Sequence, residues 1–181
     1  YNPEVITVMG GSHPTALPEE TLLDTNVDYV IQGEGEYALL SLIAVLNCGK
    51  HPPSILPRGR IDKLDFLPFP ARHLLNMDRY LSGESAHSGH KASPQINMIT
   101  SRGCPHHCAF CVIRTTFGKV YRTRSPENVL AEIDQLVSTY GIKEIDFEDD
   151  NISVDKKRMI AICQGIIDRK YGLYLNSPSG V

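Results

Sequence analysis

The sequence contains no tryptophan, few aromatic residues and no excess of positive charge. Aromatic residues make up 7% of the chain, and 18 Lys and Arg stand against 21 Asp and Glu, giving a net charge of -3. Single-stranded nucleic acids bind to aromatic platforms in basic grooves, and anionic membrane surfaces attract clusters of basic residues. The composition therefore indicates neither nucleic-acid binding nor electrostatic attachment to a membrane.

Long apolar runs are also missing. No run approaches the roughly 18 residues that span a bilayer, so we predict no membrane span. The N-terminus has no basic region followed by an apolar one, which excludes a secretory signal at this position. The chain starts at Tyr1 without an initiator Met. Each end adjoins a strand-like segment, so we expect that both ends are cut from a longer chain.

Disulfide pairing is not indicated, because the chain has five cysteines and three of them fall within eight positions. An odd, clustered set does not resemble the disulfide framework of a secreted domain. We therefore expect a cytoplasmic protein in which thiolates serve as metal ligands.

The first part of the chain, residues 1–49, alternates strand and helix signals. The apolar run Val5–Met9 is typical of a buried parallel strand, and a second short strand is expected over Asp28–Ile31. A helix is predicted from about Tyr37 to Asn47. Its expected inner face consists of Leu39, Leu40, Leu42, Ile43 and Leu46.

The next stretch, residues 50–94, has the character of a linker. It contains six of the twelve prolines and no long periodic segment. The polar segment 82–93 is expected to be mobile, because it is rich in Gly, Ser and His.

From residue 95 the alternation of strands and helices resumes. Strands are predicted over 96–100, 143–148 and 173–175, and helices over 126–140 and 155–170. The second helix is expected to place Met159, Ile160, Ile162, Ile166 and Ile167 on its core side. Repeated βα units of this length favour an α/β fold with a parallel barrel or an open sheet.

Cys104, Cys108 and Cys111 form the strongest local signal. Their loop follows a predicted strand, so we expect it at the C-terminal edge of the sheet, where α/β folds place active sites. A [4Fe–4S] cluster usually takes four thiolates, and three would leave one iron open for another ligand. Spacing alone leaves two alternatives open: a structural zinc site completed by a neighbouring histidine, or an incidental group of buried thiols.

A family resemblance decides between these alternatives. The segment 101–111 resembles the radical S-adenosylmethionine (SAM) superfamily signature, Cys-x₃-Cys-x₂-Cys with an aromatic residue before the last Cys. Sequence downstream of it resembles the same superfamily, over residues 121–129 and 145–151. Earlier segments resemble the second half of the cobalamin (B12)-binding domain that precedes many radical SAM enzymes, over residues 8–15, 18–20 and 33–36.

This resemblance implies an α/β fold in two parts. Residues 1–49 correspond to the C-terminal half of a Rossmann-like, cobalamin-binding domain, and residues 50–94 to a Pro-rich linker. Residues 95–181 correspond to the N-terminal part of the radical SAM domain. That part contains the first βα units of a (β/α)₆ partial TIM barrel.

The resemblance also implies roles for individual residues. Cys104, Cys108 and Cys111 are expected to ligate the [4Fe–4S] cluster. S-adenosyl-L-methionine is expected near Phe110, Glu148, Asp149, Asn176 and Ser177, although Phe-Glu-Asp-Asp stands here in place of the superfamily's Gly-Gly-Glu. The expected cobalamin-binding residues are Gly10, Gly11, Ser12, Gly33, Glu34 and Gly35.

The activity implied is reductive cleavage of SAM to methionine and a 5′-deoxyadenosyl radical, followed by methyl transfer or ring formation on a small-molecule substrate. A reductant such as flavodoxin or ferredoxin is the expected partner. A radical SAM methylthiotransferase is one alternative, but it calls for a second cluster and the front half supplies only Cys48. A non-catalytic zinc-binding module is the other.

Overall fold

The computed structural model describes residues 4–81 and 91–179. The chain divides into two compact units: the first runs to Asp62 and takes in Gly103–Val120, and the second comprises Lys63–Arg102 and the chain from Tyr121 onward. Most of the polar segment expected to be mobile, 82–93, lies outside the described residues. Within the described ranges, no helix has the length and apolar character needed to cross a membrane.

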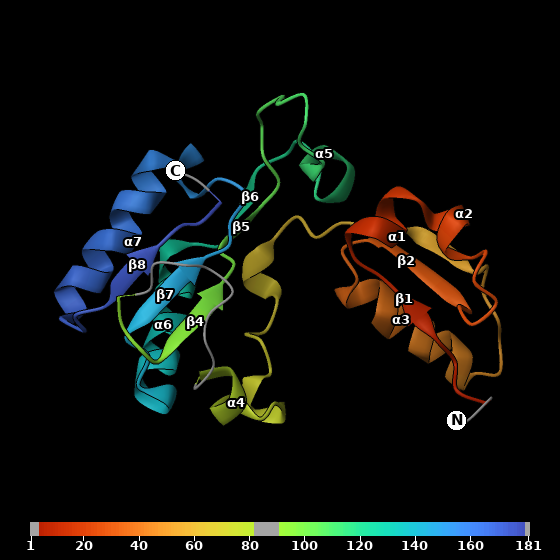
Figure 1. The fold of residues 1–181 in the computed structure, drawn as a ribbon, viewed down its shortest axis with the longest axis horizontal. Helices are drawn as coiled ribbons and strands as arrows, with labels where there is room; N and C mark the ends of the chain where they lie inside the picture. The colour runs from red at the N-terminus through yellow and green to blue at the C-terminus, as the bar shows by residue number, and fades with distance from the viewer. Residues whose placement is uncertain (1–3, 82–90, 180–181) are drawn as a thin grey trace. The chain divides into compact units, whose positions relative to one another are not determined.

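The first unit is built on a three-stranded parallel sheet in the order β1-β2-β3 (Figure 1). Tyr29, Ile31, Leu42 and Leu56 form its small apolar core. The strands are β1 (Val8–Met9), β2 (Tyr29–Gly33) and β3 (Ile55–Gly59), and the helices of residues 8–62 are α1 (Ser12–Ala16), α2 (Pro18–Thr21) and α3 (Glu36–Asn47).

The first strand is shorter and more exposed than predicted. It pairs in parallel with β2, as expected, but only through Val8 and Met9. Val5, Ile6, Val8 and Met9 are all exposed. The prediction of a buried strand is wrong because β1 lies at the edge of the sheet and is paired on one side only.

Fewer residues of α3 are buried than predicted. Leu42 is buried and Leu46 is partly buried against the core, whereas Leu39, Leu40 and Ile43 are exposed. A sheet of three short strands offers one narrow strip of contact, so only the residues along one line of the helix are covered. The apolar pattern of α3 therefore overstates its burial in the described structure.

Part of the predicted linker is a sheet strand. Strand β3 (Ile55–Gly59) pairs in parallel with the central strand β2, although Pro57 interrupts its sequence. Proline is tolerated here because β3 is an edge strand, where the missing N–H costs no ladder bond on the open side. Short helical segments follow in the second unit, namely η1 (Leu64–Phe66), η2 (Arg72–Leu74) and α4 (Met77–Leu81).

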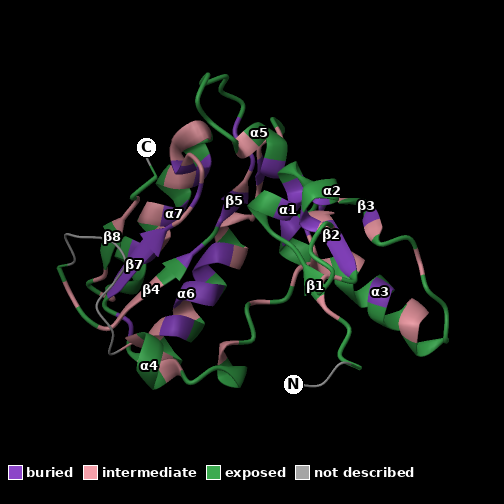
Figure 2. Ribbon diagram, turned by 45° about the vertical axis from the view of Figure 1, so that its right-hand side comes forward, coloured by how far each residue is buried: buried purple, intermediate pink, exposed green. Residues whose placement is uncertain are grey.

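The second unit contains a parallel sheet in the order β4-β7-β8. Its strands are β4 (Gln95–Met98), β7 (Glu144–Phe147) and β8 (Tyr174–Asn176), and its long helices are α6 (Pro126–Tyr140) and α7 (Lys156–Arg169). Both helices pack against each other, and their buried sides face β7 (Figure 2). The core includes Ile133, Ile145, Phe147 and Ile162, each at most 1% exposed.

Local signals explain the ends of these helices. Ser125 caps α6 through its Oγ, which accepts from Asn128 N at 3.2 Å, and Pro126 occupies the first turn. Gly141 ends the helix at φ 64°. On α7, Ile162 and Ile166 are buried as predicted, but Ile160 and Ile167 are exposed. Assigning them to the core face is wrong, because only one stripe of α7 contacts α6 and the sheet.

Candidate active site

The cysteine loop, residues 103–120, is closed at its base by two short strands. Strands β5 (Ser101–Arg102) and β6 (Arg122–Thr123) pair antiparallel at its two ends. Gly103 adopts φ 84°, and a Cβ at this position would lie 2.5 Å from Val120 O. Only glycine therefore fits where the two ends of the loop approach each other.

The three thiols of the loop are free. Cys104 is buried and its N–H donates to Gly118 O at 3.3 Å, while Cys108 and Cys111 are exposed and joined by a turn in which Cys111 N donates to Cys108 O at 3.1 Å. Among the described residues, no three His, Cys, Asp or Glu side chains are already gathered as a metal site. Three soft thiol donors on one short loop nonetheless fit the chemistry of an iron–sulfur cluster.

The second half of the loop is attached to the first sheet. Its helix α5 (Ile113–Thr116) packs against α1. From β3, Arg58 Nη2 donates to the carbonyl oxygens of Thr115 and Thr116, the latter at 2.7 Å. The cysteine loop and the sheet of residues 8–59 therefore belong to one compact unit.

Both glycine-containing turns lie at one edge of this sheet. Gly10, Gly11 and Ser12 follow β1. Gly33 is the last residue of β2, and Glu34 and Gly35 follow it. Because β1 and β2 are parallel neighbours, their carboxyl ends meet at the same edge, where open α/β sheets bind ligands. Thr15 on α1 links the two turns, since Gly33 N donates to its Oγ1 at 2.9 Å. The structure thus brings these six candidate residues together.

Two of these six residues also make contacts that stabilise the fold. Gly33 has φ 71°, and a Cβ there would lie 2.4 Å from Gly59 O. Glu34 is 5% exposed, and its Oε2 accepts from Ile61 N at 3.3 Å. The sequence did not reveal these contacts, because they depend on β3 and on Ile61, and both lie within the predicted linker, residues 50–94.

We predict that Gly33→Ala destabilises the protein more than Gly49→Ala. Both glycines have φ near 70°, so alanine is strained at either position by about 1 kcal/mol. Only at Gly33 does the added methyl group also meet backbone, whereas nothing lies within 4 Å of a Cβ at Gly49. Urea unfolding measures the difference, which we expect to exceed about 1 kcal/mol. Equal losses would show that β3 does not approach Gly33 as described.

In the second unit, Asp149 lies at the centre of a buried polar group. It accepts from Thr100 N at 3.2 and 3.1 Å, from Thr100 Oγ1 at 2.9 Å and from Ser101 Oγ. Its side chain is fully buried. Burial raises the pKa of the Asp149 carboxyl, while the hydrogen bonds from Ser101 and Thr100 and the charge of Arg158 act in the opposite direction.

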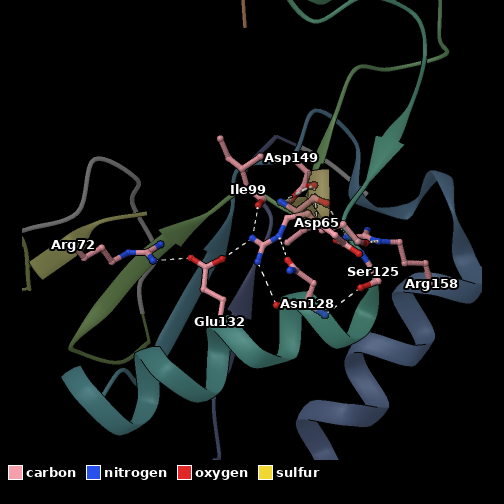
Figure 3. Close-up of polar contacts among 10 residues, drawn as sticks. Asp65, Arg72, Ile99, Ser125, Asn128, Glu132, Asp149 and Arg158 are labelled. Carbon is pink, nitrogen blue, oxygen red and sulfur yellow. Dashed lines mark hydrogen bonds and ion pairs between the residues drawn. The ribbon is translucent and has the colours of Figure 1, made fainter. Parts of the chain in front are cut away.

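Arg158 on α7 holds the same segment from the other side. Its Nη2 donates to Thr100 O at 2.9 Å and its Nε to Arg124 O at 2.7 Å. Thr100 and Ser101 directly precede the cysteine loop in the chain. Asp149 and Arg158 therefore fix the segment from which the loop departs (Figure 3).

A second buried charge group lies nearby in the same unit. Glu132 on α6 is 1% exposed and pairs with Arg72 Nη1 at 2.6 Å and Arg124 Nη1 at 2.5 Å (Figure 3). Arg124 also donates from Nη1 to Ile99 O at 3.1 Å. The sequence predicts helix α6 but not the ion pairs of Glu132. Buried ion pairs between segments so far apart in the chain leave no local pattern.

The remaining candidate residues are distributed over both units. Glu148 is half-buried at the end of β7 and accepts from Asn97 Nδ2 at 2.8 Å. Asn176 ends β8 and Ser177 follows it, and both are half-buried. Phe110 belongs to the cysteine loop and is 93% exposed. Strands β7 and β8 are parallel neighbours, so Glu148, Asn176 and Ser177 share one edge of the second sheet.

Two family models match the sequence. The B12-binding domain model matches residues 1–43, and the radical SAM superfamily model matches residues 98–178. The first match includes both glycine-containing turns. The second includes all three clustered cysteines and continues through strands β7 and β8 of the second unit.

Curated relatives match over most of this chain. An uncharacterized methyltransferase of Pyrococcus horikoshii is 38% identical over 176 residues, which are 89% of this chain and 37% of the relative. Cytidylyl-2-hydroxyethylphosphonate methyltransferase of Streptomyces wedmorensis is 31% identical, over 98% of this chain and 40% of the relative. The chain thus spans about two fifths of the length of these relatives.

A solved structure has a similar fold. The radical SAM methyltransferase TsrM of Kitasatospora setae, with cobalamin and a [4Fe–4S] cluster bound, aligns at a TM-score of 0.62 with 19% identity. The alignment covers 93% of this chain and 36% of TsrM. The likeness confirms the predicted α/β fold class, a Rossmann-like part followed by the start of a partial barrel.

Proposed function

We propose that this chain, which belongs to the radical SAM superfamily and carries a B12-binding part in front of it, acts in cobalamin-dependent methyl transfer to a small molecule. One observation supports this most strongly. The cysteine loop packs into the same compact unit as the sheet whose edge carries the B12-type glycine turns. An enzyme that uses both cofactors requires their binding residues to be close together.

The three thiolates of Cys104, Cys108 and Cys111 would hold a [4Fe–4S] cluster. When bound and reduced, such a cluster supplies one electron that cleaves SAM to methionine and a 5′-deoxyadenosyl radical. The chain itself orients the donors. Burial of Cys104 and its bond to Gly118 O position the first thiolate, and the turn from Cys108 to Cys111 presents the other two.

The second sheet would contribute the SAM contacts. Glu148 is the better acceptor for the SAM ammonium group, because its carboxylate is half-buried and lies at a strand end. Asp149 already accepts from Thr100 and Ser101, so it acts as a positioning residue. Asn176 and Ser177 are suited to ribose hydroxyls, and Phe110 to the adenine.

The cobalamin contacts are proposed at the edge formed by the two glycine turns. Gly10, Gly11, Ser12 and Gly35 are the residues most open to a ligand, because Gly33 and Glu34 are engaged with β3 and Ile61. We further propose a cytoplasmic location and a flavodoxin or ferredoxin as electron donor, since reductive SAM cleavage needs a low-potential electron.

Product analysis tests this proposal. The anaerobically reconstituted, reduced protein is incubated with SAM and cobalamin, and the nucleosides are separated by chromatography. We expect methionine and 5′-deoxyadenosine from one molecule of SAM, and S-adenosylhomocysteine from a second molecule whose methyl group is transferred to the added cobalamin. A protein that binds about four irons yet yields neither 5′-deoxyadenosine nor methylated cobalamin contradicts the proposal.

A further inference from the structure

The second sheet has one apolar face and one polar face. Ile145 and Phe147 on β7 point into the core formed with α6 and α7. Side chains alternate along a strand, so Glu144, Asp146 and Glu148 point to the opposite face. The parallel register places Asn97 and Asn176 beside Asp146 on that face. Carboxylates therefore follow one another along the centre of the polar face.

Asp146 is the unusual member of this row. It is fully buried, and within residues 4–81 and 91–179 neither Oδ1 nor Oδ2 has a hydrogen-bond partner. Its neighbours in the row are engaged: Glu144 Oε2 accepts from Lys91 N and Ala92 N, each at 2.7 Å, and Glu148 Oε1 accepts from Asn97 Nδ2. A buried carboxyl group without donors is costly, which indicates a ligand that supplies them.

The surroundings of Asp146 favour a cationic ligand. Gln95 Oε1, on the neighbouring strand and the same face, is also a buried acceptor that receives no hydrogen bond from the residues that the structure describes. The acceptor atoms that lack partners on this face are therefore oxygens with negative or partial negative charge. Lys91 is held beside this face by the bond from its N to Glu144 Oε2, and its Nζ lies over the Tyr174 ring, 6.0 Å from the centroid.

A ligand can reach Asp146 through its neighbour on β4. Asn97 is exposed, stands directly across from Asp146 in the register, and is held by a single bond to Glu148. Rotation of this surface side chain would break one exposed hydrogen bond, and we expect this movement to give a ligand access to Asp146.

We propose that Asp146 binds a nitrogen cation of the substrate, a primary ammonium or a guanidinium group, with Gln95 as a second acceptor. This inference rests on the proposed function, because it assigns the polar face of the second sheet to the substrate. A charge-assisted bond to Asp146 supplies the donors that the carboxylate lacks. Asp146 is accordingly a specificity-determining residue that selects amine-bearing substrates over neutral or anionic ones.

The test uses butylammonium chloride as the probe and ligand-observed NMR on the purified protein, at constant ionic strength. Butanol and butyrate serve as neutral and anionic counterparts of the same length. We expect millimolar binding of butylammonium alone, about tenfold weaker in Asp146→Asn. Glu127→Gln, which removes an exposed acid from α6, should bind like the wild type.

Other outcomes overturn the inference. Equal binding to the wild type and Asp146→Asn would place the probe elsewhere, and binding that appears only in Lys91→Ala would show that Lys91 fills the site. Asp146→Leu separates folding from binding: it should melt no lower than the wild type, because it removes a buried group without donors. A lower melting temperature would mean that Asp146 has a structural partner.

The inference fails separately from the proposed function. Asp146 is assigned to the substrate, so Asp146→Asn should retain its iron and should still cleave SAM. If the wild type neither assembles a cluster nor cleaves SAM, the proposed function fails whatever the probe does. If the variant loses SAM cleavage together with probe binding, Asp146 serves SAM itself and the substrate assignment is wrong.

Discussion

Cys108→Ser is expected to lose nearly all of the iron that the wild type binds on anaerobic reconstitution, from about four irons per chain to well below one. A serine hydroxyl is a hard donor that stays protonated at neutral pH, so it replaces a thiolate poorly on an iron–sulfur cluster. Cys108 is exposed, so we expect its substitution by serine to leave the packing of the loop unchanged. Colorimetric iron and sulfide assays give the result.

Cys48→Ser provides the matched control for this experiment. Cys48 is another exposed thiol, but it caps the end of α3 and lies outside the cysteine loop. It should retain the wild-type content of iron and sulfide. Iron loss in both variants would point to a general effect of removing exposed thiols, and iron retained in Cys108→Ser would exclude that thiol as a ligand.

Asp149→Leu is expected to lower the free energy of unfolding by about 3 kcal/mol. The substitution leaves the Thr100 N–H and the hydroxyl groups of Thr100 and Ser101 without their buried acceptor, and each of these three unsatisfied donors costs about 1 kcal/mol or more. Urea unfolding of the metal-free protein measures the loss. Asp134→Leu, which removes a half-exposed partner of Arg169 and Tyr171, should cost clearly less, about 1 kcal/mol.

The same carboxyl group should make stability depend on pH. Burial is the main cause that raises the pKa of Asp149 in the folded protein above its ordinary value. For an acid with a raised folded pKa, the contribution to stability is present below the unfolded pKa and is lost as pH rises through the folded pKa. Wild type should therefore lose stability relative to Asp149→Asn from about pH 4 upward. Parallel pH profiles would contradict the raised pKa.

The sequence was sufficient to predict a helix or strand where residues next to it in the chain mark its ends. Helix α6 was predicted to its ends, because Ser125, Pro126 and Gly141 are stop and start signals that need no tertiary context. The central strand β7 was predicted as well, because apolar and acidic residues alternate along it with the two-residue period of a strand. In these elements, sequence pattern and packing favour the same structure.

Prediction failed where burial depends on a distant partner. Val8 on β1 and Leu40 on α3 look like core residues, but the narrow sheet covers neither. Strand β3 contains a proline and gains its order from pairing with β2. The sequence also did not reveal that Asp149 accepts hydrogen bonds from residues 49 and 48 positions earlier in the chain, whereas its predicted contact with SAM stays a prediction.

Electron paramagnetic resonance of the reduced, anaerobically reconstituted protein, recorded before and after addition of SAM, tests the central claim most directly. We expect a [4Fe–4S] signal that shifts when SAM is added, because three thiolates leave one iron open for SAM. The signal should be absent from Cys108→Ser. A protein that takes up zinc in place of iron, or a cluster whose spectrum does not respond to SAM, would contradict the radical SAM assignment of this loop.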